Sequence, residues 1–174
     1  MESVNLPALR ANQAYARNAL SGEWEITSQY TPGLPNTQES FEQLKSRAPA
    51  ADSSLKISEV MADNATYIKD EDGEYPDWIE IVNTGTSEIN LEGYGLSDDP
   101  NNARKWRFPS AVIAPGQYLI VYASGKDRVD GPNLHANFKL SAEGEQVLIS
   151  DAAGVVLDEM SFGLLKADQS ASRQ

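Results

Sequence analysis

The sequence contains no cysteine among its 174 residues. This absence excludes disulfide bonds, zinc sites built from thiolates, and catalysis by a thiol. It fits either a reducing compartment or a bacterial exterior whose proteins do without disulfides. Cysteine usage therefore leaves the compartment open.

Histidine is nearly absent, since the chain has only His135, in "NLHANF". No second histidine and no cysteine could share a metal ion with it, and no serine or acid stands at the spacing of a catalytic motif. Ser124, in "ASGKD", lacks the flanking glycines of a nucleophile elbow. We therefore predict that His135 is an ordinary loop or strand residue, that the chain has no catalytic residues, and that it is not an enzyme.

Long hydrophobic runs are also missing. No stretch of eighteen or so apolar residues is present, so we expect no membrane-spanning helix. The opening "MESVNLPALR" lacks the basic segment and the apolar stretch of a signal peptide. If the protein is exported, its signal is expected outside this chain.

Basic residues are few, with 14 Lys and Arg against 26 Asp and Glu and a formal net charge of −12. Most of the acidic excess lies after residue 50. Nucleic-acid binding draws most of its affinity from basic side chains that displace counterions from phosphates. We therefore predict that nucleic acid is not a partner.

What the sequence does contain, from residue 55 onward, is a series of short apolar-alternating runs separated by Gly, Pro, Asn and Asp. Their length and composition are those of strands. Seven such runs without a long helical period predict an all-β antiparallel sandwich or barrel. The turn "DAAG" at 151–154 predicts a hairpin between the last two runs. The seven runs are 55–62, 77–83, 93–97, 105–109, 116–124, 145–150 and 155–162.

The first 54 residues differ from the rest in composition and in the elements they predict. Residues 8–20 are rich in alanine and by propensity alone predict a helix. "GEWEIT" at 22–27 alternates like a short strand with Trp24 and Ile26 on one face, and "TPGLPN" is a dense turn signal. Residues 37–54 then form a linker with room for a short helix.

The two ends of the chain resemble each other. "LPALRANQAYAR" at 6–17 aligns with "FGLLKADQSASR" at 162–173, and the alignment pairs Gln13 with Gln169 and Arg17 with Arg173. Internal similarity at a fixed spacing is typical of repeat architectures. The match argues against the helix that propensity predicts at 8–20.

Several motifs after residue 54 carry a family likeness: "ISEVMA", "DGEYPDWIEIVNTG", "INLEGYGLSDDPNN", "IAPGQYLIVYASGKDR", "LHANFKLSAEGEQVLISDAAG" and "VLDEMSFG". Residues 55–174 together resemble a bacterial lamin tail domain. The resemblance implies an immunoglobulin-like antiparallel β-sandwich with an N-terminal extension. It also implies a secreted protein, because such domains occur in tandem and beside spore-coat-protein-H-like (CotH-type) kinase domains or extracellular hydrolases.

In this family the final hairpin is followed by a strand that contains Trp and then by a closing turn. Here the corresponding pieces, "AYAR", "SGEWEIT" and "TPGLPN", stand at the front of the chain. We therefore assign 1–36 to the tail end of a preceding repeat, 37–54 to the linker and 55–174 to the sandwich. A sandwich without its last strand has an unpaired edge, and we expect the strand of Trp24 and Ile26 to pair with its own or a neighbouring sandwich.

Two loops are rich in carboxylates, one with Asp70 and Asp72 and one with Asp98 and Asp99. Calcium takes six to eight oxygen ligands from such loops, but the spacing is not that of an EF-hand. Solvated turns are the alternative, because Asp and Asn also stabilise turns through local backbone bonds. Calcium is the single metal considered for this chain, and no other cofactor is expected.

Glu59 and Glu80 each stand in mid-strand between apolar residues. A paired acid and base is one interpretation. Strand alternation offers a simpler one, in which Glu80 points away from the core onto a solvated face.

The predicted function is therefore a non-enzymatic interaction or structural module of a larger, secreted bacterial protein, as one unit of a tandem array. The partner would be another protein or a neighbouring repeat. One alternative is a carbohydrate-binding module with a platform of exposed aromatic rings. The other is a calcium-dependent accessory domain of an extracellular enzyme. The aromatic residues considered are Trp78, Tyr94, Trp106, Tyr118 and Tyr122.

Overall fold

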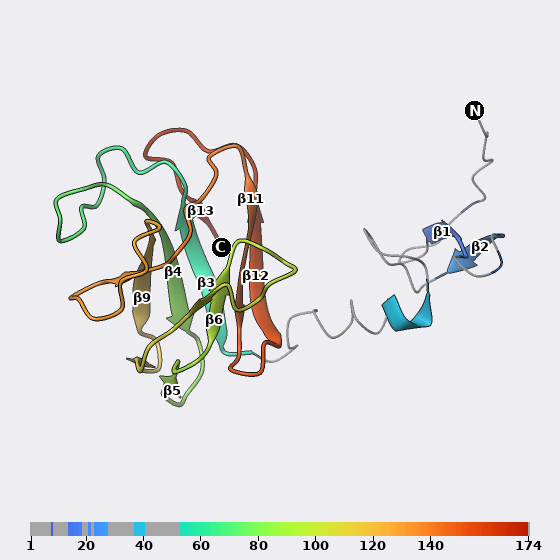
Figure 1. The fold of residues 1–174 in the computed structure, drawn as a ribbon, viewed down its shortest axis with the longest axis horizontal. Helices are drawn as coiled ribbons and strands as arrows, with labels where there is room; N and C mark the ends of the chain where they lie inside the picture. The colour runs from blue at the N-terminus through green and yellow to red at the C-terminus, as the bar shows by residue number, and fades with distance from the viewer. Residues whose placement is uncertain are drawn as a thin grey trace. The chain divides into compact units, whose positions relative to one another are not determined.

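The computed structural model describes residues 8, 14–18, 21, 23–27, 37–40 and 53–173. The chain forms two compact units, Met1–Ala48 and Pro49–Gln174 (Figure 1). Among the described residues, no helix has the length and apolar character needed to cross a membrane.

The first unit contains a two-stranded antiparallel sheet made of β1 (Ala14–Arg17) and β2 (Trp24–Thr27). Tyr15 stacks on Trp24 across the pair, with ring centroids 5.4 Å apart. The helix that propensity predicts for 8–20 is therefore wrong over β1, because cross-strand pairing outweighs a weak local preference.

Only the start of the predicted linker is described in the first unit. Residues 38–40 are helical, and the backbone N–H of Ser40 donates to Thr37 Oγ1 at 3.1 Å, as at a helix N-terminus. The predicted linker residues 41–52 lie outside the described residues.

The second unit is a sandwich of two sheets. The larger has the order β10-β9-β4-β3-β13 and the smaller has the order β12-β11-β6-β7, while β5 and β8 form a separate pair. All pairs are antiparallel except β10 with β9. The strands are β3 (Leu55–Met61), β4 (Asp77–Asn83), β5 (Ile89–Asn90), β6 (Gly95–Ser97), β7 (Trp106–Arg107), β8 (Val112–Ile113), β9 (Tyr118–Ala123), β10 (Leu134–His135), β11 (Glu145–Ser150), β12 (Val156–Phe162) and β13 (Ala171–Ser172).

The core lies between these two sheets, because successive side chains of a strand point to opposite faces and the facing sides of the two sheets are apolar. In β4, Ile79 and Ile81 are fully buried in it, and Val147 and Ile149 of β11 meet them from the smaller sheet. The predicted all-β antiparallel sandwich is confirmed.

The outer face of the larger sheet carries a second, smaller cluster. Trp78, Met61 and Tyr122 pack together there, and the hydroxyl of Tyr122 donates to the carbonyl of Lys69 at 3.0 Å. This cluster anchors the loop between β3 and β4 against the sheet, and that loop carries the carboxylates considered below.

All seven predicted runs contain strands, and the hairpin predicted at 151–154 joins β11 to β12, with Gly154 at a φ of 88°. Four strands of the second unit were not predicted: β5, β8, β10 and β13. Each has only two residues, which is too short to show an alternating pattern.

Candidate functional site

Strand β13 is an edge strand of the larger sheet and is the first of two candidate functional sites. It pairs with β3 through Ala171 opposite Val60 and Ser172 opposite Glu59. Within the described part of the chain, no strand pairs with its outer edge. An unpaired strand edge is a ready template for another strand.

Contacts before and beside β13 hold it firmly. Leu165 is buried in the core, and the carboxylate of Asp168 accepts the backbone N–H groups of Ala65 and Thr66 at 2.8 Å each. The hydroxyl of Thr66 also donates to Asp168 at 2.6 Å, and this bond and the backbone ones lower the pKa of Asp168. Strand β13 is therefore a fixed part of the sandwich.

Arg173, directly after β13, bridges the two sheets. Its guanidinium pairs with Asp158 of β12 at 2.8 Å, and Asp158 is only 4% exposed. Asp158 also accepts the backbone N–H of Ile57 at 2.9 Å. The side of β13 that carries Arg173 therefore faces the smaller sheet.

The hairpin residues singled out in the sequence, Trp24 and Ile26, both lie in β2. They are 42% and 46% exposed, and both are on the side of the sheet that carries Tyr15. Within the chain, β2 pairs with β1, and β13 belongs to a different sheet. Pairing of β2 with a sandwich therefore stays a prediction.

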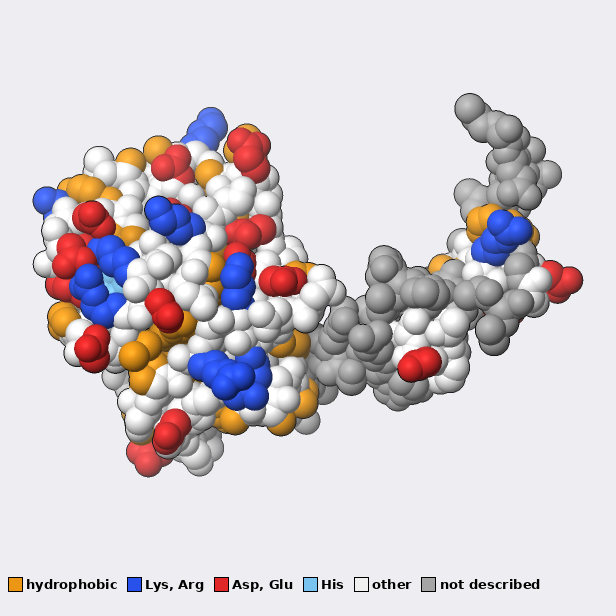
Figure 2. Space-filling model, in the orientation of Figure 1, with side chains coloured by type: hydrophobic (Ala, Val, Ile, Leu, Met, Phe, Trp, Pro, Cys, Tyr) orange, Lys and Arg blue, Asp and Glu red, His pale blue; other side chains and the backbone are white. Residues whose placement is uncertain are grey.

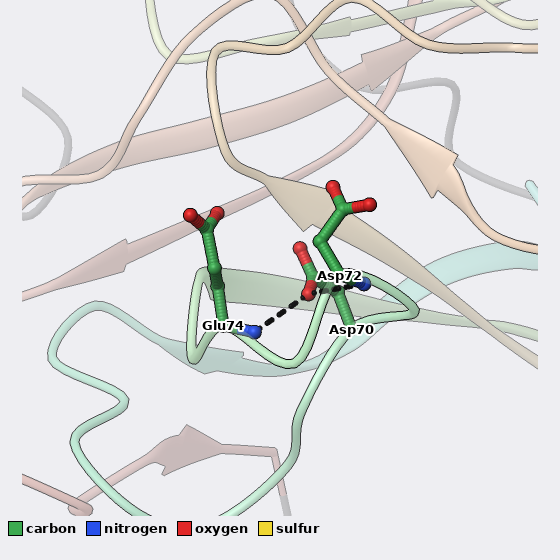
Figure 3. A group of neighbouring side chains, drawn as sticks. All are labelled: Asp70, Asp72 and Glu74. Atoms are coloured by element: carbon green, nitrogen blue, oxygen red, sulfur yellow. Dashed lines mark hydrogen bonds between the residues drawn. The ribbon is translucent and has the colours of Figure 1, made fainter.

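The loop between β3 and β4 is the second place. Asp70, Asp72 and Glu74 place one carboxylate oxygen each within 4.8 Å of one another, and Figure 3 shows the three side chains on one tight turn. The backbone N–H groups of Asp72 and Glu74 donate to Asp70 at 3.0 and 2.9 Å. Gly73 takes a φ of 80° at the tip of this turn.

A lysine ammonium occupies the centre of this carboxylate group. Lys126 Nζ lies 2.5 Å from Asp70, 2.6 Å from Asp72 and 2.8 Å from Glu74. Its own burial lowers the pKa of Lys126, but hydrogen bonds to the three carboxylates outweigh this and raise it. Calcium at this position would have to displace the ammonium group.

The same contacts hold the carboxylates in their charged forms. Burial raises the pKa of Asp70, but the Lys126 hydrogen bond and the backbone N–H groups leave it below its ordinary value. Hydrogen bonds from Arg128 and then from Lys126 lower the pKa of Asp72. The loop is therefore cross-linked by charge to the segment after β9.

His135 lies against this loop and has partners that its sequence position does not reveal. Ser124 Oγ lies 2.9 Å from Nδ1, and both Glu71 oxygens lie 3.1 Å from Nε2. Asn133 also donates to Glu71, and this bond is the first cause of a strongly lowered pKa for that carboxyl. Neither partner stands at the spacing of a catalytic motif, and only folding brings Ser124 and Glu71 to His135.

This serine–histidine–glutamate arrangement is a buried structural network. The ring of His135 is fully buried and stacks on Tyr122, with centroids 5.2 Å apart. A general base must reach a proton of the substrate, and both nitrogens of this ring are occupied inside the protein. His135 was predicted to lie in a loop or a strand, and it is the last residue of β10.

The remaining acidic residues singled out in the sequence lie elsewhere. Asp98 pairs with Lys105 at 2.7 Å, and Asp99 accepts the backbone N–H of Asn101 in a turn. Glu59 and Glu80 stand directly opposite each other on β3 and β4. Each accepts a serine hydroxyl, Glu59 from Ser170 and Glu80 from Ser58.

The five aromatic residues do not form an exposed row. Trp78, Trp106 and Tyr122 are buried, Tyr94 packs against the core, and Tyr118 is 58% exposed.

On the face that Figure 2 shows, Lys and Arg side chains of the second unit lie among acidic ones and do not form a continuous basic patch.

Comparison with known families gives one match. The model of the Lamin Tail Domain family matches residues 48–163, about two thirds of the chain. The match includes strands β3 to β12 and ends before β13. No curated protein matches the chain.

Proposed function

Because the chain belongs to the lamin tail domain family, whose members are immunoglobulin-like domains without catalytic machinery, we propose that it is a structural module that binds another protein through the outer edge of β13. The observation that carries this proposal is the unpaired edge itself: among the described strands, β13 has a partner on one side only.

The edge is suited to a protein partner for two reasons. Its backbone groups are presented by a strand that Asp168 and Arg173 hold in place, so little order has to be gained on binding. An added strand satisfies these groups through main-chain bonds, which is a common mode of peptide recognition.

We further propose that the module is one unit of a tandem array in a larger bacterial protein that is exported. The likeness of residues 6–17 to residues 162–173 supports an array, because β1 corresponds to the segment around β13. The resemblance to bacterial lamin tail domains supports export.

The proposed function is tested by measuring mass in solution. Size-exclusion chromatography with light scattering should show that the full chain associates as its concentration rises. A chain that starts at Ala51 should stay monomeric, and it should fold because, among the residues that the structure describes, every buried apolar residue lies between Leu55 and Leu165. A full chain that is monomeric at all concentrations would contradict an interaction between modules.

A further inference from the structure

We propose that a cavity beside the start of β4 and the end of β9 binds a free α-amino acid with an apolar side chain. The cavity has a volume of about 360 Å³ and opens to solvent. Its lining comes from residues 74–77, from residues 123–124 and from Lys139. The inference goes beyond the proposed function, because no residue of β13 lines this cavity.

The cavity lies where three segments of the chain run side by side. Asp77 begins β4 and stands opposite Ala123 of β9, while Ser124 pairs with Lys139 through an isolated antiparallel bridge. Neighbouring strands are about 4.8 Å apart, so the backbone at Asp77 and the backbone at Lys139 are separated by about 10 Å. Between them, β9 ends in the small side chains of Ala123 and Ser124. The space between the two outer segments therefore stays open.

Opposite charges line this space without meeting each other. Within the described part of the chain, neither Asp77 nor Lys139 has an ion pair, so their charged atoms lie more than 4.0 Å apart. The other carboxylate of the lining, Glu74, already pairs with Lys126 at 2.8 Å. A ligand that carries both an ammonium and a carboxylate group would therefore find one complementary charge for each.

Asp77 in particular is suited to an ammonium group. Its side chain is half-buried, and the backbone N–H of Leu140 donates to one of its oxygens at 3.3 Å and so fixes its orientation. Burial raises the pKa of Asp77, and the N–H of Leu140 and the charge of Lys139 do not cancel that rise. An ammonium group beside the carboxylate would replace the interactions with water that burial removes.

The size and the rest of the lining favour a single amino acid with an apolar side chain. A volume of about 360 Å³ is near the lower limit of small-molecule sites, which suits one residue better than a longer peptide. The ring of Tyr75, with Pro76 and the methyl group of Ala123, offers apolar surface. An aromatic or branched side chain would pack there, with the ammonium group toward Asp77 and the carboxylate toward Lys139.

NMR titration of the isotope-labelled full chain with L-phenylalanine and with L-leucine tests the proposal. The backbone signals of Asp77, Ala123 and Lys139 should shift and saturate as expected for one site. Two matched ligands each lack one charge, 2-phenylethylamine the carboxylate and 3-phenylpropionate the ammonium group. Each should bind about tenfold more weakly than phenylalanine, because a charged contact is lost. An analogue that binds as tightly as phenylalanine would overturn the proposal.

Two variants test the residues themselves. Asp77→Asn keeps an oxygen for the N–H of Leu140, and Lys139→Met changes an exposed side chain, so both should fold. Each should weaken the binding of phenylalanine about tenfold. Asp130→Asn and Lys166→Met are the matched controls, because they change exposed charges that do not line the cavity, and they should leave the affinity unchanged. The absence of saturable shifts with either amino acid, or one affinity for all four variants, would contradict the site.

Discussion

At the scale of single residues, Lys126 links the β3–β4 loop to the segment after β9. Its ammonium group meets three carboxylates, and one of them, Asp70, has a side chain with no exposed surface. Removing one partner of a buried pair leaves an uncompensated charge, which costs far more than the loss of an exposed pair.

We predict that Lys126→Met lowers the free energy of unfolding by about 2 kcal/mol at neutral pH, somewhat less than for a fully buried pair because Lys126 is partly exposed. Urea denaturation measures the difference from the unaltered chain. Lys166→Met is the matched control, because Lys166 is exposed and forms no ion pair within the described ranges of the chain. An equal effect of the two substitutions would contradict the role of Lys126.

The stabilisation lost in this variant should depend on pH in a defined window. The pKa values of Asp70 and Asp72 are lowered from 3.8, so their contribution is complete above that value and disappears as the pH falls through the lowered values. The pKa of Lys126 is raised from 10.5, so its contribution is complete below that value and disappears at higher pH. The difference in free energy of unfolding between the unaltered chain and the Lys126→Met variant should therefore shrink at both low and high pH. A difference that is the same at both extremes as at neutral pH would show that the ion pairs are not its source.

At the scale of elements, the turn before β11 depends on a single glycine. Gly144 has a φ of 108°, and a Cβ there would lie 2.7 Å from the carbonyl oxygen of Phe162, at the end of β12. The turn that positions the β11–β12 hairpin therefore requires both the conformation and the small size of glycine.

We predict that Gly144→Ala lowers the free energy of unfolding by about 3 kcal/mol, through backbone strain and the clash with Phe162. Gly73→Ala is the matched control, because Gly73 also has a positive φ of 80° but has no atom within 4 Å of the added carbon. Its loss should be about 1 kcal/mol, from strain alone. Denaturant unfolding of both variants compares them, and equal losses would argue against the clash.

Secondary structure was predictable where an element is long enough to show a pattern. Strands β4 and β11 have the predicted bounds, 77–83 and 145–150, because alternation over six or seven residues is a clear signal. Strand β13 was not predictable in this way. Its two residues pair with β3 only because Leu165 and Asp168 fix the chain just before them.

At the scale of the whole molecule, charge decides which partners are compatible. The formal net charge is −12, and several of the basic side chains, Lys56, Lys105, Lys126, Arg128 and Arg173, are paired with carboxylates. A phosphate backbone would meet repulsion from this acidic excess.

We predict that the full chain does not bind duplex DNA at about 0.15 M salt, where nucleic-acid binders rely on counterion release. An electrophoretic mobility shift assay with labelled duplex measures this, with a basic DNA-binding domain as the positive control. A shift that weakens steeply as salt rises would contradict the prediction.

The sequence by itself determined the fold class and excluded disulfides and thiol chemistry. Alternating runs, the lack of cysteine and the acidic balance depend on residue types and spacing, and these are readable along the chain. It also indicated that β1 and the segment around β13 are counterparts, because like sequences align. Only the tertiary structure decided that Lys126 fills the carboxylate group of the β3–β4 loop and that Ser124 and Glu71 meet His135. These contacts join residues more than ten positions apart, and their geometry exists only after the sheets have packed against each other.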